Sequence, residues 1–98
     1  MVGTVTATIW KFPLHVEHFQ QIRMPRGAEA ISLQGQRGQP CLWVVVDPLA
    51  PPVSVPLLMV GTGHTIPPGY PRHLGTWLET DEGNSYVWHF FGPEVLAP

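Results

Sequence analysis

Charged residues are scarce in this chain of 98 residues. They make up 12% of the sequence, with five Lys and Arg against seven Asp and Glu, whereas a typical soluble domain has about 25%. The basic residues are scattered and never adjacent, so we expect no binding to duplex nucleic acid. A surface so poor in charge relies on uncharged polar groups, or part of its apolar area is covered by another copy or another protein. We therefore expect a homo-oligomer.

Cysteine and long apolar runs are also nearly absent. The single Cys41 cannot form an intrachain disulfide, and its place in an apolar stretch predicts a small core residue rather than a reactive thiol. No window approaches the roughly 20 apolar residues of a membrane span, and the N-terminus lacks the basic start and apolar run of a signal peptide. These absences predict a protein of a reducing cytoplasm that has no membrane partner and is not exported.

Helical periodicity is missing as well, and alternating apolar residues take its place. The stretch from Cys41 to Asp47 is apolar on both alternating faces, so neither face of such a strand can be left in water. Glycines at 35 and 38 and prolines at 48, 51 and 52 bound it. We expect this strand to be central in a sheet, with Leu42 and Val44 buried.

The same reasoning predicts about seven short strands, separated by tight turns at 25–27, 35–38 and 81–84. The last strand is apolar on both faces, which predicts a central position and burial of Val87 and Trp88. Pro56 cannot donate to a ladder, so its strand is expected at a sheet edge or with a bulge. The expected strands are residues 5–12, 20–24, 28–34, 41–47, 53–60, 73–79 and 85–91.

These elements predict one domain over residues 1–98 with an all-β, mainly antiparallel fold. A small β-sandwich or a partly open barrel suits about seven short strands at this spacing. One short helical turn is allowed near residues 14–19, and the prolines of residues 92–98 predict an irregular tail. At this length, roughly two thirds of the unfolded surface can be buried, which is enough for a core without disulfides.

Residues 61–71 form the longest stretch without a periodic pattern. Three glycines and three prolines predict a loop of defined shape. The N–H groups of closely spaced glycines can face an anion, although the segment matches neither the dinucleotide fingerprint nor the Walker loop. Turn glycines beside a surface histidine would explain the same pattern. For a small anionic ligand, the predicted binding residues are Gly61, Thr62, Gly63, His64, Arg72 and Trp77.

Metal binding and catalysis find little support in the sequence. His15 and His18 have ligand-like spacing, but paired cysteines, or a histidine pair on a helix with an acidic partner, are missing. The serines lie in strand contexts, and the carboxylates are isolated except for the turn pair Asp81 and Glu82. We predict no metal site, no cofactor and no catalytic residues, and hence no enzyme. The tryptophans are expected first in the core; an exposed one would offer a stacking platform or a protein hot spot.

Several segments resemble a known family when taken together. They are Ile9-Trp-Lys-Phe-Pro-Leu14, Met24-Pro-Arg-Gly-Ala-Glu29, Pro40-Cys-Leu-Trp43 followed by Val46-Asp-Pro48, Gly61-Thr-Gly-His64 with Ile66-Pro67, Leu74-Gly-Thr76 and Val87-Trp-His-Phe90. Over residues 9–91 the chain resembles small uncharacterised proteins of tailed bacteriophages and their prophages. The proline-rich residues 48–56 and the tail after Phe91 depart from that family. The resemblance implies no catalytic residues, and it implies the cytoplasm of a bacterial host.

A small phage protein without a catalytic set acts most simply by binding. The leading hypothesis is a counter-defence protein that sequesters a small anionic host signal, such as a cyclic nucleotide, in a pocket formed by residues 61–71 and completed across an oligomer interface. The alternative is a protein–protein inhibitor that masks a host defence nuclease or polymerase with an aromatic surface. A third hypothesis is a minor virion component.

Overall fold

A computed structural model describes residues 6–98, and these residues form seven strands and no helix. The predicted all-β class with about seven short strands is confirmed. Val5, which we expected in the first strand, lies outside the described residues. No helix in the described part of the chain could cross a membrane. The strands are β1 (Thr8–Pro13), β2 (Phe19–Pro25), β3 (Glu29–Gln36), β4 (Gln39–Val46), β5 (Pro52–Gly61), β6 (Arg72–Asp81) and β7 (Asn84–Gly92).

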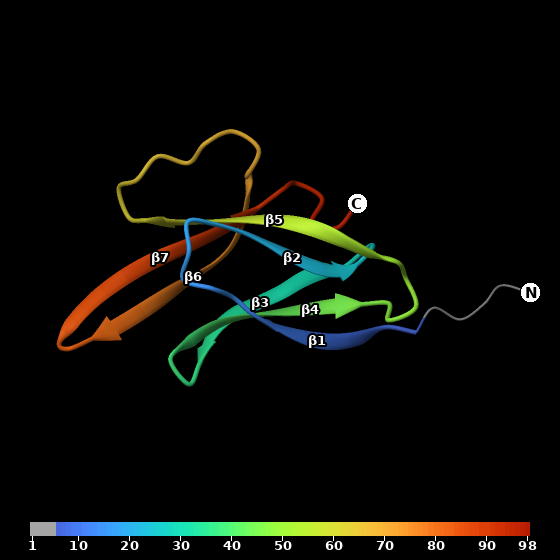
Figure 1. The fold of residues 1–98 in the computed structure, drawn as a ribbon, viewed down its shortest axis with the longest axis horizontal. Coiled ribbons are helices and arrows are strands. Elements are labelled where there is room, and N and C mark those ends of the chain that lie inside the picture. The colour runs from blue at the N-terminus through green and yellow to red at the C-terminus, as the bar shows by residue number, and fades with distance from the viewer. Residues whose placement is uncertain (1–5) are drawn as a thin grey trace, which may run out of the picture.

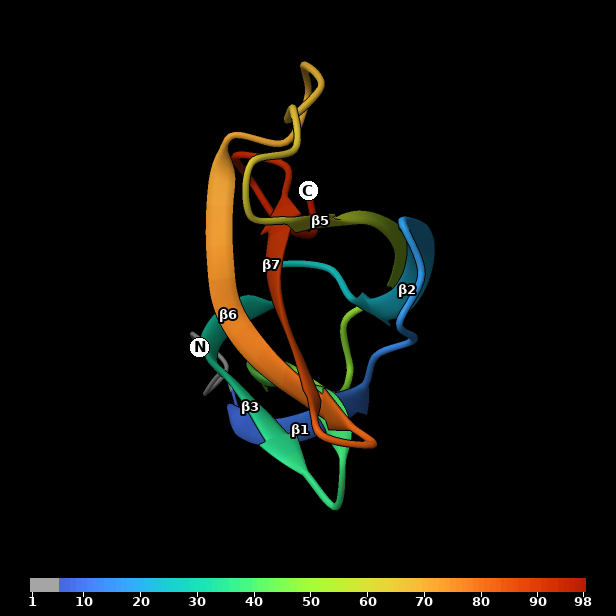
Figure 2. The ribbon, with the colours of Figure 1, turned by 90° about the vertical axis from the view of Figure 1, so that its left-hand side faces the viewer.

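The strands form two antiparallel sheets. One has the order β1-β4-β3 and the other the order β2-β5-β7-β6. Figure 1 shows the β6–β7 hairpin extending past the end of β5, away from the N- and C-termini. Figure 2 shows the four-stranded sheet strongly curved, with β6 and β7 on one side and β2 on the other. The fold is therefore an open arrangement of two sheets, consistent with a small sandwich and not a closed barrel.

The strand β4 occupies the centre of its sheet, as the two apolar faces predicted. It pairs with β1 on one side and β3 on the other, and both Leu42 and Val44 are fully buried. Burying such side chains contributes about 1.5–3 kcal/mol each. The core also takes in residues from the irregular C-terminal tail. Its buried members are Leu14, Met24, Ala28, Leu33, Leu42, Val44, Val46, Val55, Leu57, Met59, Trp77, Phe90, Leu96 and Ala97.

Two tight turns set the register of the hairpins. In the β3–β4 turn, Arg37 and Gly38 have φ values of 53° and 76°, and in the β6–β7 turn, Glu82 and Gly83 have φ values of 46° and 82°. Two successive positive φ angles are typical of a type I′ turn, whose twist matches that of the paired strands. Both hairpins are therefore closed by two-residue turns of the kind that holds antiparallel strands in one register.

The two sheets meet where β3 crosses β6, and glycines make this close approach possible. A Cβ added to Gly75 would lie 2.6 Å from the Cβ of Leu33, and one added to Gly35 would lie 2.6 Å from Nε1 of Trp77. Neither distance is compatible with a side chain. Trp77, predicted from sequence as a ligand-binding residue, is buried at this junction as part of the core.

Residues 16–18 form a bend and residues 14–15 are irregular, so the allowed helical turn is not present. The side chain of Gln20 explains the difference, because its amide donates to the carbonyl of His15 at 2.8 Å and its oxygen accepts from the His15 N–H at 3.0 Å. The Leu14 N–H donates to the carbonyl of Pro40 at 2.8 Å. The backbone groups of Leu14 and His15 therefore bond to Pro40 and to the Gln20 side chain instead of to a neighbouring helical turn. The strand β2 then begins at Phe19.

Two expectations were wrong, one about the position of a strand and one about the burial of two side chains. The strand with Pro56 is not at an edge, since β5 lies between β2 and β7, but its pairing with β7 covers only Leu58 to Gly61. Pro56 therefore faces β2 alone and interrupts no ladder on its other side. The strand β7 is interior as expected, yet Val87 is exposed and Trp88 half-buried, because β7 runs past the end of β5.

Candidate functional site

The chain leaves β5 in a tight turn at the start of the loop 61–71. The His64 N–H donates to the carbonyl of Gly61 at 3.1 Å, and Gly63 has a φ of 88°, which glycine adopts without strain. The N–H of Gly61 donates to Nδ1 of the His64 ring at 3.3 Å. This N–H was expected to face an anion, and it is instead occupied within the turn.

A chain of hydrogen bonds joins this turn to the outer face of the second sheet. The Thr62 hydroxyl lies 2.8 Å from Nε2 of His89, whose Nδ1 lies 2.9 Å from the Thr76 hydroxyl. That hydroxyl is also 3.2 Å from Nε2 of His73. Both ring nitrogens of His89 are therefore engaged by threonines. Among residues 6–98, no three His, Cys, Asp or Glu side chains are grouped to hold a metal ion.

The six residues predicted from sequence do not share one pocket. Gly61, Thr62 and His64 line a groove with part of β7, while Trp77 and Arg72 line two other pockets. Space around Gly63 is open, because a Cβ added there would meet no atom within 4 Å. The structure thus brings three of the predicted residues together and separates the cation and the tryptophan from them.

The groove beside β7, which we call the edge groove, has a volume of about 310 Å³ and is largely apolar. Two aromatic rings form part of it, since Tyr86 and Trp88 stack with centroids 6.2 Å apart and planes inclined by 19°. Trp88 is held in place by its Nε1, which donates to Oε1 of Glu79 at 3.1 Å. The lining residues are Gly61, Thr62, His64, Ser85, Tyr86, Val87 and Trp88.

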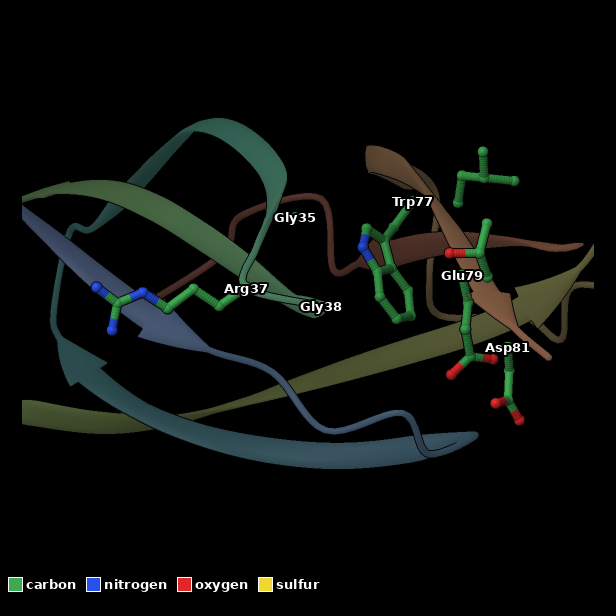
Figure 3. Close-up of a pocket in the computed structure, with 8 residues that line it drawn as sticks. Gly35, Arg37, Gly38, Trp77, Glu79 and Asp81 are labelled. Atoms are coloured by element: carbon green, nitrogen blue, oxygen red, sulfur yellow. The ribbon is translucent and has the colours of Figure 1, made fainter. Parts of the chain in front are cut away.

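A second pocket of about 440 Å³ lies between the turn of the β3–β4 hairpin and β6. Figure 3 shows Glu79 and Asp81 extending from the same strand, whereas Arg37 points away from both carboxylates. The ring of Trp77 lies between β6 and the β3–β4 hairpin, next to Gly35, where the two elements are in contact. This pocket is polar and acidic on one side, so it does not suit an anion.

Sequence reasoning missed the exposed part of the β6–β7 hairpin, residues 78–87, which we call the distal hairpin. Leu78 is 57% exposed and faces Val87 across the hairpin, and Tyr86 is also exposed. The alternating pattern had predicted burial for Val87. A signal was present in the charges, because the chain after Arg72 contains no Lys or Arg, while Glu79, Asp81 and Glu82 cluster in this segment.

Comparison with known proteins gives a family without an assigned activity. The family model described as Domain of unknown function (DUF7352) matches residues 5–97. No curated protein and no solved structure matches the chain. The expected resemblance to an uncharacterised family is confirmed at this level, and a bacteriophage origin stays a prediction. The match spans nearly the whole sequence, and the chain therefore belongs to the DUF7352 family.

Proposed function

We propose that this protein is a non-enzymatic binding protein that docks onto another protein through the distal hairpin. One observation carries the proposal: Leu78 and Val87 face each other across the hairpin and remain 57% and 40% exposed. Tyr86, on the opposite face, is 45% exposed. An apolar cluster of this kind, rimmed by polar residues, is typical of a protein-binding surface.

The distal hairpin is suited to docking because it is already ordered. Its type I′ turn and its four cross-strand pairs, from Leu78 with Val87 to Asp81 with Asn84, fix the backbone before any partner arrives. A preformed surface loses less conformational entropy on binding than a flexible one. Tyr86 supplies a rigid aromatic side chain, which is the residue class most often found at the centre of protein interfaces.

The resemblance to proteins of tailed bacteriophages supports a host protein as the partner, and hence an inhibitor of a host defence nuclease or polymerase. A small anionic ligand is the weaker proposal, for two reasons. The Gly61 N–H already donates to His64, and the only cation predicted for that site, Arg72, lines a different pocket. Sequestration of an anionic signal remains a prediction, as does self-assembly.

The test is capture of a partner from bacterial host lysate with wild-type protein and with the double variant Leu78→Ser/Val87→Ser. We expect one protein to be retained by the wild type and lost with this variant, because the apolar cross-strand pair is removed from the surface. The matched control is Ile9→Ser/Ile31→Ser, which removes two isoleucines of similar exposure, 57% and 55%, from the other sheet. Retention by the distal-hairpin variant, or equal loss with the control, would contradict the proposal.

A further inference from the structure

The strand β7 has an unpaired edge over residues 84–87. Its pairing with β5 covers only Trp88 to Phe91, because β5 ends at Gly61. The following turn carries the chain away, closed by the hydrogen bond from the His64 N–H to the Gly61 carbonyl. If β5 continued past Gly61, it would lie beside residues 84–87. The edge groove occupies this place.

The register predicts which backbone groups this edge presents. Asp81 and Asn84 flank the two-residue turn and are a hydrogen-bonded pair in such a hairpin. Hydrogen-bonded and non-hydrogen-bonded pairs alternate, so Ser85 and Val87 direct their N–H and C=O groups away from β6. Within residues 6–98, no backbone hydrogen bond joins either residue to the loop 61–71. The edge therefore offers two donors and two acceptors in strand geometry.

The side chains beside this edge favour an apolar neighbour. The stacked rings of Tyr86 and Trp88 lie on one face, and Val87 lies on the other. A strand added here would place alternate side chains against these two faces, since successive residues of a strand point to opposite sides. The groove volume of about 310 Å³ leaves room for such side chains.

Charge selects among the possible occupants. Glu79, Asp81 and Glu82 lie in the distal hairpin, and residues 73–98 contain no Lys or Arg to neutralise them. An added segment with basic residues at its ends would be attracted by these three carboxylates, and an acidic segment would be repelled by them. A second copy pairing through the same edge would bring no Lys or Arg to it, because its own β7 and C-terminal tail have none.

We infer that an extended segment of a partner protein, apolar at alternate positions and flanked by Lys or Arg, adds to β7 as a further strand in the edge groove. This inference rests on the proposed protein-binding function and names the chemistry of the partner. Main-chain hydrogen bonds to Ser85 and Val87 supply affinity, and side-chain contacts with Tyr86 and Trp88 supply selectivity.

The experiment uses the full chain and the synthetic peptide Lys-Lys-Thr-Val-Tyr-Val-Thr-Lys, capped at both ends, in an NMR titration. Its control peptide has Glu in place of each Lys. We expect the lysine peptide to bind about tenfold or more tightly than the glutamate peptide, and to slow amide exchange at Ser85 and Val87. Equal binding of the two peptides, or exchange that is unaltered at both amides, would overturn the inference.

Two proline variants test the edge directly. Ser85→Pro removes an outward N–H from β7, while Thr80→Pro removes an outward N–H from the opposite edge of the same hairpin, directly across from Ser85. We expect Ser85→Pro to weaken lysine-peptide binding about tenfold, since a lost hydrogen bond leaves an unpaired acceptor, and Thr80→Pro to leave it unchanged. Equal effects of the two prolines would overturn strand addition.

Failure of this inference is distinguishable from failure of the proposed function. If Leu78→Ser/Val87→Ser abolishes partner capture but Ser85→Pro does not, the hairpin binds through its side-chain faces and only strand addition is refuted. If neither variant affects capture, both are refuted. Light scattering tests whether a second copy of the chain occupies the edge instead. If the wild type has the mass of a dimer and Ser85→Pro has the mass of one chain, the edge binds a second copy, and the inference of a segment from a partner protein is overturned.

Discussion

The two halves of the β6–β7 hairpin have similar apolar patterns and opposite surroundings. In the half near the sheet junction, Trp77 and Phe90 are buried, with Phe90 at 0% exposure. In the distal hairpin, Leu78 and Val87 are 57% and 40% exposed, although each is adjacent in sequence to a buried or half-buried tryptophan. Alternation of apolar residues therefore establishes the strand, whereas the elements that cover it decide which residues enter the core.

Covering of the junction half comes from both sides. The first sheet packs through β3, where Gly35 receives Trp77, and the start of the loop 61–71 contacts the other face, where the Thr62 hydroxyl lies 2.8 Å from Nε2 of His89. Figures 1 and 2 show this loop standing beyond β5, next to the end of β6 that begins at Arg72. The distal hairpin has neither cover, so its apolar residues are available for a partner.

The largest expected difference in stability is between aspartate substitutions of two valines, one in the buried strand β4 and one in the distal hairpin. Val44→Asp should abolish cooperative folding, because an unpaired buried charge costs a large part of the roughly 5–15 kcal/mol that stabilises a domain. Val87→Asp should change the free energy of unfolding by less than about 1 kcal/mol, since Val87 is exposed. Circular dichroism and thermal melting of both variants measure the difference. If Val44→Asp melts cooperatively near the wild-type temperature, the placement of β4 in the core is wrong.

A smaller effect is expected at the junction itself. Gly75→Ala should destabilise the protein by about 1–3 kcal/mol, because the new methyl group would lie 2.6 Å from the Cβ of Leu33, an atom fixed to the backbone. Gly61→Ala is the control, since its new Cβ would meet the His64 ring at 3.1 Å, and that exposed side chain can rotate away. Urea denaturation of the two variants gives the comparison, and equal stability would mean that β3 and β6 are not in close contact.

Local sequence determined the strands and turns well. The glycines at 38 and 83 close the two hairpins within the expected turns, and the double apolar face of residues 41–47 placed β4 at the centre of a sheet. Errors arose where distant residues decide. The two hydrogen bonds between the Gln20 side chain and the His15 backbone replace a helical turn, and the point where β5 ends leaves Val87 exposed. Neither the hydrogen bonds of Gln20 nor the end of β5 produces a periodic pattern in the sequence.

Prediction of the site shows the same limit. Loop composition directed attention to Gly61, Thr62 and His64, and these three residues border the edge groove. It could not indicate that the other wall is β7, because the pairing of strands distant in sequence has no local signal. The missing information was that β5 ends opposite Trp88.

The smallest expected effect separates two threonines on one face of β6. Thr76 lies in the junction half and its hydroxyl is within 2.9 Å of His89 Nδ1 and 3.2 Å of His73 Nε2. Thr80, four residues along, is exposed in the distal hairpin opposite Ser85. Both side chains are β-branched, so Thr→Val keeps shape and strand propensity and removes only the hydroxyl.

We expect Thr76→Val to lower the free energy of unfolding by about 0.5–1.5 kcal/mol, the net worth of a typical hydrogen bond. Thr80→Val should be neutral or slightly stabilising, because its hydroxyl is in water. Paired urea melts measure both changes, and NMR of the His89 ring provides an independent readout, since its signals should shift in Thr76→Val alone. If both variants lose equal stability, the histidine and threonine contacts contribute nothing specific, and the junction half would be held by its apolar packing alone.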